Sequence, residues 1–127
     1  MIKIDHVALW VKDLEQMKRF YQTYFSACAG GKYENPKKQF QSYFLQLPSG
    51  PRLELMHRPE IAERLGPDAF GYAHIALSMG SKEAVDEMAQ TLQDAGFEKL
   101  SGPRTTGDGC YEAAFKDPEN NTLEITV

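Results

Sequence analysis

Residues 4–9 of the chain read IDHVAL, and residues 72–77 read YAHIAL. A second pair of stretches repeats in the same way, because residues 52–56 read RLELM and residues 122–126 read TLEIT. His74 follows His6 by 68 residues, and Glu124 follows Glu54 by 70 residues. Two separate matches at nearly one spacing indicate a duplicated unit.

The first half of the chain has the pattern of a β-α-β-β-β unit. Alternating apolar residues around His6 predict a strand, and Asp13 followed by Gln16 predicts the start of a helix. The helix has an apolar stripe at helical spacing, formed by Leu14, Met17, Phe20, Tyr21 and Tyr24. After a turn-rich segment at 30–38, strands at 41–47 and 52–56 are expected to form a hairpin.

The second half repeats this order. A strand is predicted at 72–78, a helix at about 81–95 with Gly96 just past its end, and strands at 111–115 and 122–127. We therefore predict an α+β fold in which two βαβββ modules, 1–57 and 71–127, pair into a curled mixed sheet. A linker at 58–70 joins the modules, and residues 1–127 form one domain.

The alternation along the strands indicates on which face of the sheet the His and Glu side chains lie. In all four strands the apolar alternation occupies the face that a helix can cover, so His6, Glu54, His74 and Glu124 point to the opposite face. These side chains would meet only if the two halves curl around a common cleft. Two imidazoles and two carboxylates suit a divalent transition metal ion and leave positions for water.

Each of these residues also has a simpler interpretation. A single histidine on a strand is usually a hydrogen-bonded structural residue, and a glutamate between leucines usually faces solvent. A solvated face, however, has no reason to carry His on both first strands and Glu on both last strands. The repetition therefore favours the metal site.

Composition predicts a small soluble protein. The chain has 127 residues, 42% of them hydrophobic, and a net charge of −4, so no basic surface for nucleic acid is expected. No apolar stretch reaches the roughly 18 residues of a membrane-spanning helix, and residues 1–4 lead directly into a strand without a signal peptide. Cys28 and Cys110 lack metal-ligand spacing, which favours reduced thiols in a cytoplasmic protein.

The chain resembles the vicinal oxygen chelate superfamily, which includes glyoxalases, bleomycin-resistance proteins and dioxygenases, over essentially its whole length. The resemblance rests on HVAL at 6–9, GYAHIAL at 71–77, Gly102-Pro103, and Asp117-Pro118 ahead of Leu123-Glu124. It implies a U-shaped metal cleft, and the ligand order His, Glu, His, Glu is similar to bacterial glyoxalase I. The resemblance also implies one nickel, cobalt or zinc ion per site, a small-molecule substrate, and a homodimer whose sites are shared between subunits.

The family chemistry acts on substrates with two adjacent oxygens. The ion stabilises an oxyanion as a Lewis acid, while a carboxylate moves a proton between neighbouring carbons. By resemblance, Glu124 is expected to be the catalytic base and Glu54 its pseudo-symmetric partner.

Two positions depart from glyoxalase I. Where that enzyme has an Arg and an Asn that hold glutathione, this chain has Trp10 and Arg58. Trp10 could form a stacking wall for another substrate or could simply pack at the end of the sheet. Arg58 could pair with a substrate anion or remain exposed in the linker. The other candidates for the pocket wall are Arg52, Met56 and Tyr72. His57 is interpreted as a surface residue, with a pocket role left open.

Three classes of function follow from this pattern. The first is a metal-dependent lyase or isomerase of glyoxalase type, with a substrate other than the glutathione hemithioacetal. The second is a fosfomycin-type thiol transferase or an extradiol dioxygenase, which resemble sites with only three protein ligands, so that Glu54 counts against them. The third is a metal-free protein that sequesters a drug, against which the intact ligand set argues.

Overall fold

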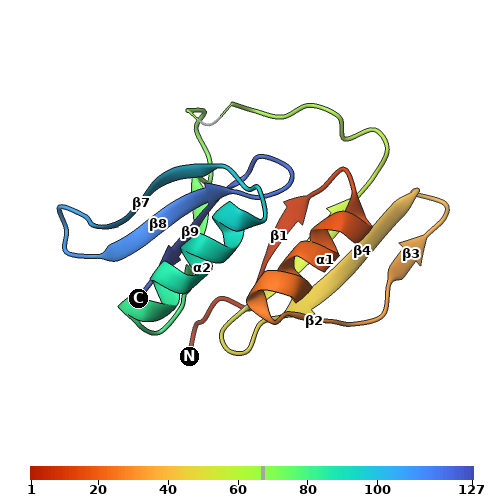
Figure 1. Cartoon of the computed structure of the whole chain (residues 1–127). Helices are drawn as coiled ribbons and strands as arrows, with labels where there is room; N and C mark the ends of the chain where they lie inside the picture. The colour runs from red at the N-terminus through yellow and green to blue at the C-terminus, as the bar shows by residue number, and fades with distance from the viewer. Residues whose placement is uncertain (67) are drawn as a thin grey trace. The chain divides into compact units, whose positions relative to one another are not determined.

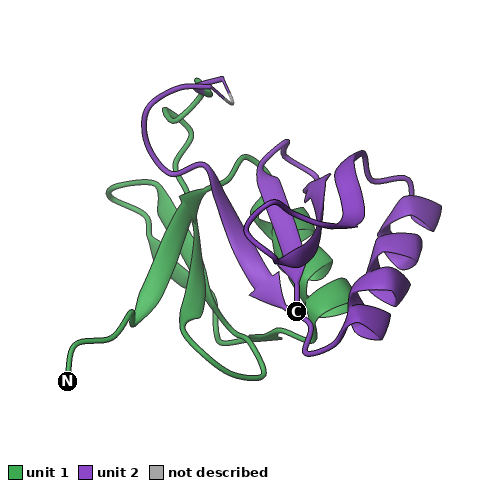
Figure 2. Cartoon of the chain, turned by 90° about the vertical axis from the view of Figure 1, so that its left-hand side faces the viewer, with its two compact units in different colours: residues 1–64 green, residues 65–127 purple. Residues whose placement is uncertain are grey.

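The computed structural model describes residues 1–66 and 68–127 of the chain (Figure 1). These residues form two compact units, residues 1–64 and residues 65–127, shown in green and purple in Figure 2. The boundary between the units falls inside the predicted linker at 58–70. Each unit has one helix and its own mixed sheet, which confirms the predicted α+β class.

Unit 1 has the strand order β1-β5-β4-β2, with the short strand β3 paired to β4. Strands β1 and β5 run parallel, whereas β4 is antiparallel to β5, β2 and β3. In chain order its elements are β1 (His6–Trp10), α1 (Leu14–Phe25), β2 (Cys28–Ala29), β3 (Tyr33–Asn35), β4 (Phe40–Gln46) and β5 (Arg52–His57).

Unit 2 repeats this arrangement with the strand order β6-β9-β8-β7. Strands β6 and β9 run parallel, and the remaining pairs are antiparallel. Its elements are β6 (His74–Ser78), α2 (Lys82–Asp94), β7 (Lys99–Thr105), β8 (Tyr111–Lys116) and β9 (Thr122–Thr126). Within the described residues, no helix is long and apolar enough to cross a membrane.

Both helices begin at the residues expected from the sequence. The backbone N–H of Gln16 donates to the Asp13 side chain over 3.0 Å, and that of Ala84 donates to Ser81 over 3.1 Å. These bonds satisfy backbone donors that have no partner within the helix. Gly96 ends the second helix with a φ of 91°, a conformation that glycine adopts without steric cost.

The buried face of each sheet is formed by alternate residues of the strands that carry the candidate ligands. Leu53 and Leu55 are buried in unit 1, and Leu123 and Ile125 are buried in unit 2. Apolar residues of the helix complete each core, namely Met17, Phe20 and Tyr21 in α1 and Val85, Ala89 and Leu92 in α2. Because side chains alternate along a strand, Glu54 and Glu124 lie on the face opposite the core.

Three short or irregular strands are not predicted by the sequence pattern. The segment at 30–38, predicted as turns, contains β3, and β2 lies just before it. Strand β7 contains Gly102-Pro103 and shifts register twice against β8, so it lacks regular alternation. Gly102 has a φ of 77° and lies so close to the carbonyl of Glu112 that a Cβ atom would not fit there. Such irregularities interrupt the alternation of apolar and polar residues from which a strand is predicted.

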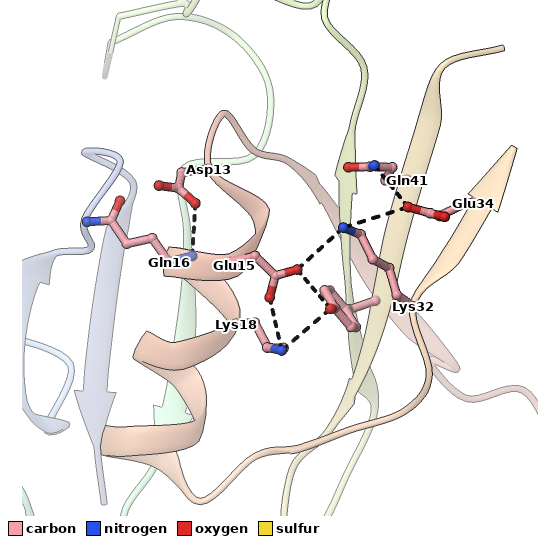
Figure 3. Close-up of polar contacts among 8 residues, drawn as sticks. Asp13, Glu15, Gln16, Lys18, Lys32, Glu34 and Gln41 are labelled. Atoms are coloured by element: carbon pink, nitrogen blue, oxygen red, sulfur yellow. Dashed lines mark hydrogen bonds and ion pairs between the residues drawn. The ribbon is translucent and has the colours of Figure 1, made fainter. Parts of the chain in front are cut away.

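A polar network joins α1 to the sheet of unit 1 (Figure 3). Tyr43 Oη donates to Glu15 Oε1 over 2.8 Å, while Lys18 Nζ lies 3.0 Å and Lys32 Nζ 3.5 Å from the same carboxylate. Lys18 and then Tyr43 lower the pKa of Glu15. The network continues to β3 and β4, because Gln41 Nε2 donates to Glu34 Oε1 over 3.2 Å.

Candidate metal centre

The first pair of predicted ligands lies on neighbouring strands of unit 1. Strands β1 and β5 place His6 opposite Arg52 and Ala8 opposite Glu54. The imidazole Nε2 of His6 is 3.7 Å from Glu54 Oε1, and the two side chains are 38% and 15% exposed. This pair therefore has one nitrogen and one oxygen donor on the face opposite the core.

The second pair is built in the same way in unit 2. Strands β6 and β9 place His74 opposite Thr122 and Ala76 opposite Glu124, so the register between His and Glu is the same as in unit 1. Nε2 of His74 lies 3.1 Å from Glu124 Oε2, with exposures of 39% and 19%. The duplication therefore preserves strand pairing, side-chain direction and exposure together.

The remaining nitrogen of His6 is held by a carboxylate. Nδ1 donates to Asp5 Oδ2 over 2.8 Å, and Arg52 Nη2 donates to the same oxygen over 2.8 Å. The hydrogen bonds from His6 and then from Arg52 lower the pKa of Asp5. Since Nδ1 carries the proton, the neutral ring keeps its lone pair on Nε2, the atom that faces Glu54. Many metal-binding histidines are oriented by an acceptor in this way.

The carboxyl group of Glu124 has a raised pKa. Burial is the largest cause, and the nearby carboxylate of Glu112 adds to it, while the charge of His74 acts in the opposite direction. Glu112 lies on β8, two residues from Ala114, which is paired with Glu124. A carboxyl group whose ionised form is disfavoured is suited to accept a proton.

Sequence reasoning missed Asp5 and Glu112. The signal for Asp5 was its position directly before His6, the first predicted ligand, but its counterpart in the repeat is Ala73. The signal for Glu112 was its alternation with Ala114 along the strand, yet the corresponding position of unit 1 is Ser42. Both residues are absent from one repeat, so a comparison of the repeats does not select them.

Each unit brings together one pair of the predicted ligands. In the described part of the chain, no three His, Cys, Asp or Glu side chains form a group that could hold an ion. Each unit therefore supplies half of the predicted donor set. In unit 1 the ring of Phe44 packs edge-on against His6 at a centroid distance of 5.3 Å, and the guanidinium carbon of Arg52 lies over the Phe44 ring, 4.3 Å from its centroid.

Trp10 and Arg58, the two departures from glyoxalase I, contact each other. The guanidinium carbon of Arg58 lies 4.7 Å from the centre of the Trp10 ring, and its Nε is 3.3 Å from Glu60 Oε1. Trp10 is 42% exposed and also packs edge-on against Phe40 at 6.2 Å. Met56 is half-buried and pairs with Trp10 in the sheet. The indole and guanidinium therefore form a partly exposed stacked pair.

Two other residues differ from their predicted setting. Tyr72 was expected to share the phase of His74, but β6 begins only at His74, and Tyr72 lies fully exposed before it. His57 was interpreted as lying past a strand end, whereas it is the half-buried last residue of β5. Its Nδ1 lies 2.9 Å from the carbonyl oxygen of Val11.

Comparisons with known proteins agree with this architecture. Residues 3–125 match the Glyoxalase/Bleomycin resistance protein/Dioxygenase superfamily. The chain belongs to this superfamily, which confirms the predicted resemblance.

Solved structures of several family proteins share the fold. A glyoxylase/bleomycin resistance protein/dioxygenase domain from Frankia sp. EAN1pec is similar with a TM-score of 0.85 and 21% identity, covering 99% of this chain and 91% of that one. The trypanothione-dependent glyoxalase I of Leishmania major has a TM-score of 0.79 and 20% identity, with coverages of 99% and 86%. The fosfomycin resistance protein FosX of Listeria monocytogenes has a TM-score of 0.72 and 25% identity, with coverages of 98% and 89%.

Proposed function

We propose that this protein is a metal-dependent lyase or isomerase of glyoxalase type that acts on a small substrate with vicinal oxygens. The observation that carries the proposal is the His–Glu pair, which the same strand register builds in both units. In the proposed site, His6, Glu54, His74 and Glu124 together hold one divalent ion, either within one chain or across a dimer. Members of the superfamily commonly bind such an ion.

The chemistry of the donors fits a nickel, cobalt or zinc ion. Each pair offers an imidazole nitrogen and a carboxylate oxygen, and two such pairs would hold a divalent ion while leaving room for substrate oxygens beside it. The hydrogen bond from His6 to Asp5 fixes the tautomer that a metal ligand needs. When bound, the ion supplies Lewis-acid stabilisation of negative charge on a substrate oxygen.

The chain's own residues then move the proton. Glu124 is the proposed base, because burial and the nearby Glu112 raise its pKa and so favour proton uptake from a substrate carbon. Glu124 then delivers the same proton to the neighbouring carbon, while Glu54, which occupies the equivalent place in unit 1, is its proposed pseudo-symmetric partner. The stacked Trp10–Arg58 pair is proposed to bind the part of the substrate that does not react, with Arg52, Met56 and Tyr72 as further contacts.

Thiol transfer to an epoxide is the second candidate. It is favoured by the likeness to the fosfomycin resistance protein, which is 25% identical over 98% of this chain. The predicted fourth ligand, Glu54, counts against it, since sites for that reaction resemble sets of two His and one Glu.

A metal analysis followed by two assays tests the proposal. Protein purified without chelator is expected to contain one divalent ion per four-ligand site, and His74→Ala is expected to lose most of it. The wild type is then assayed with small α-hydroxy and α-oxo compounds, and separately with fosfomycin and a thiol. Stoichiometric metal in the His74→Ala variant would overturn the ligand assignment, and turnover of fosfomycin alone would select the second candidate.

A further inference from the structure

A second candidate site lies in unit 1, apart from the ligand pairs. It is a hollow of about 450 Å³ between the β3–β4 hairpin and the end of β5. Its walls include Glu34, Pro36, Phe40, Gln41, His57 and Pro59. The volume is within the range of about 300 to 1,000 Å³ that is usual for small-molecule sites. None of the four proposed metal ligands lines it.

The histidine in this hollow has a fixed orientation. Nδ1 of His57 lies 2.9 Å from the backbone carbonyl oxygen of Val11, and a carbonyl can only accept a hydrogen bond. Nδ1 must therefore carry a proton. In the neutral ring, Nε2 is left as a hydrogen-bond acceptor. His57, which lines the hollow, thus offers Nε2 as an acceptor, and its tautomer is set by the backbone.

The walls combine ring surfaces with further acceptors. Phe40 is supported edge-on by Trp10 at 6.2 Å and by Tyr33 at 6.0 Å, which fixes one aromatic wall. Oε1 of Glu34 accepts a hydrogen bond from Gln41 Nε2 over 3.2 Å, and the same oxygen lies 3.8 Å from Lys32 Nζ (Figure 3). A carboxylate at the rim disfavours an anionic ligand, whereas a neutral donor is compatible with it.

We propose that this hollow binds a neutral aromatic alcohol of the phenol class. The ring packs against Phe40 and the two prolines, and the hydroxyl donates to Nε2 of His57. The ligand needs both its ring and its hydroxyl, because the ring makes contact with the apolar walls and the hydrogen bond to the imidazole sets the orientation of the ligand. The site uses none of the four proposed metal ligands, and its Phe40 wall packs against Trp10, which is proposed to bind the substrate.

Nuclear magnetic resonance with phenol as the probe tests this assignment. Titration of the wild-type protein with phenol is expected to shift the Nε2 resonance of His57 and the backbone amides of Phe40 and Gln41. Anisole, which has the ring but no hydroxyl proton, is expected to bind about tenfold more weakly, as loss of one hydrogen bond would produce. Equal binding of phenol and anisole would overturn the proposal.

Two variants distinguish a role of His57 in phenol binding from effects on folding and on the proposed metal site. In His57→Asn the shorter amide can still donate to Val11, while the acceptor at the Nε2 position is removed, so phenol binding is expected to fall at least about tenfold with an otherwise unchanged amide spectrum. His74→Ala, in the other unit, is expected to bind phenol as the wild type does, even if its metal is lost. Phenol binding that is unaffected in His57→Asn would show that His57 does not form the site.

Discussion

His6 donates a hydrogen bond from Nδ1 to the carboxylate of Asp5 over 2.8 Å, and its Nε2 faces Glu54. The bond fixes both the tautomer and the direction of the ring. Its counterpart in the repeat is missing, because Ala73 precedes His74. The two proposed ligand pairs therefore share their strand geometry but differ in how the imidazole is oriented.

Asp5→Ala is expected to lower metal affinity by about 10 to 100-fold, the usual effect of removing a group that orients a metal ligand. The measurement is competition with a chelator of known affinity. Glu87→Ala, which removes the same charge from the exposed face of α2, is the matched control and is expected to bind metal like the wild type. Equal affinity of the Asp5 variant and the wild type would mean that Asp5 does not act on the site.

Glu124→Gln is expected to reduce kcat by about 10² to 10⁴-fold at saturating metal, the contribution of a positioned general base. The assay uses the first α-oxo or α-hydroxy compound that the wild type turns over. Full turnover by the variant would exclude Glu124 as the base.

Glu112→Gln serves as the companion variant to this prediction. Because the Glu112 carboxylate helps to raise the pKa of Glu124, its removal is expected to lower that pKa. Glu124 acts as a base only when it is deprotonated, so the acidic limb of the plot of kcat against pH should move to lower pH. A limb that stays in place or moves to higher pH would contradict the coupling between these two carboxyl groups.

The fold was largely predictable because its regular parts obey simple periodicities. The strands carrying His6 and Glu54 alternate, and their repetition at His74 and Glu124 indicated both the module and the face on which these side chains lie. The short strand β3 was not predicted because three residues are too few to show a periodicity. Strand β7 was not predicted because Gly102 interrupts its alternation.

For the candidate site, the sequence indicated residues only where the two repeats agree. The positions equivalent to Asp5 and Glu112 hold a different residue type in the other repeat. The interactions of these two residues are therefore seen only in the structure, in the hydrogen bond from His6 to Asp5 and in the effect of Glu112 on the pKa of Glu124. Arg52 was predicted to line a pocket, and its hydrogen bond to Asp5 depends on side-chain direction at the start of β5. The role of Tyr72 was inferred from a strand that begins two residues later than expected.

Activity with the glutathione hemithioacetal of methylglyoxal is expected to be weak or absent. Trp10 and Arg58 replace the polar residues that resemblance assigns to glutathione, and here they stack on each other with Arg58 paired to Glu60. The loss of a few hydrogen bonds of about 1 to 3 kcal/mol each lowers kcat/KM by orders of magnitude. Turnover at the rate of an efficient glyoxalase I, measured with metal-loaded protein, would show that other residues bind the peptide.

The chain is expected to form a homodimer, because family members are often dimers and a shared site would complete the donor set in each half. Sedimentation at micromolar concentration should give about twice the chain mass. A single species of 14.3 kDa would reject the dimer and would require that any four-ligand site form within one chain.

The turn between β8 and β9, which precedes Glu124, is held by Asp117. Its buried carboxylate accepts the backbone N–H of Glu119 at 2.8 Å and that of Asn121 at 3.0 Å, and the Asn121 side chain donates to its second oxygen at 2.8 Å. Asp117→Ala leaves these donors without their partner. The variant is expected to lose about 2 to 3 kcal/mol in the free energy of unfolding, measured by urea titration.

The pH dependence of stability provides a second measurement on the same residue. Burial raises the pKa of Asp117 above its usual value of 3.8, despite hydrogen bonds that act in the opposite direction. Between 3.8 and the folded-state pKa, the folded protein holds a proton that the unfolded chain has released, so the contribution of Asp117 to stability falls as pH rises through this window. Below 3.8 both states are protonated and the effect is absent.

Asp117→Asn removes this titration while keeping an oxygen that can accept the backbone N–H groups. The difference in unfolding free energy, wild type minus variant, is therefore expected to decrease from pH 3.8 upward until the folded-state pKa is passed, and then to level off. Urea titrations of both proteins at closely spaced pH values give this difference directly, because the other carboxyl groups titrate in both. A difference that increases with pH in this range would mean that the hydrogen bonds to Asp117 outweigh its burial.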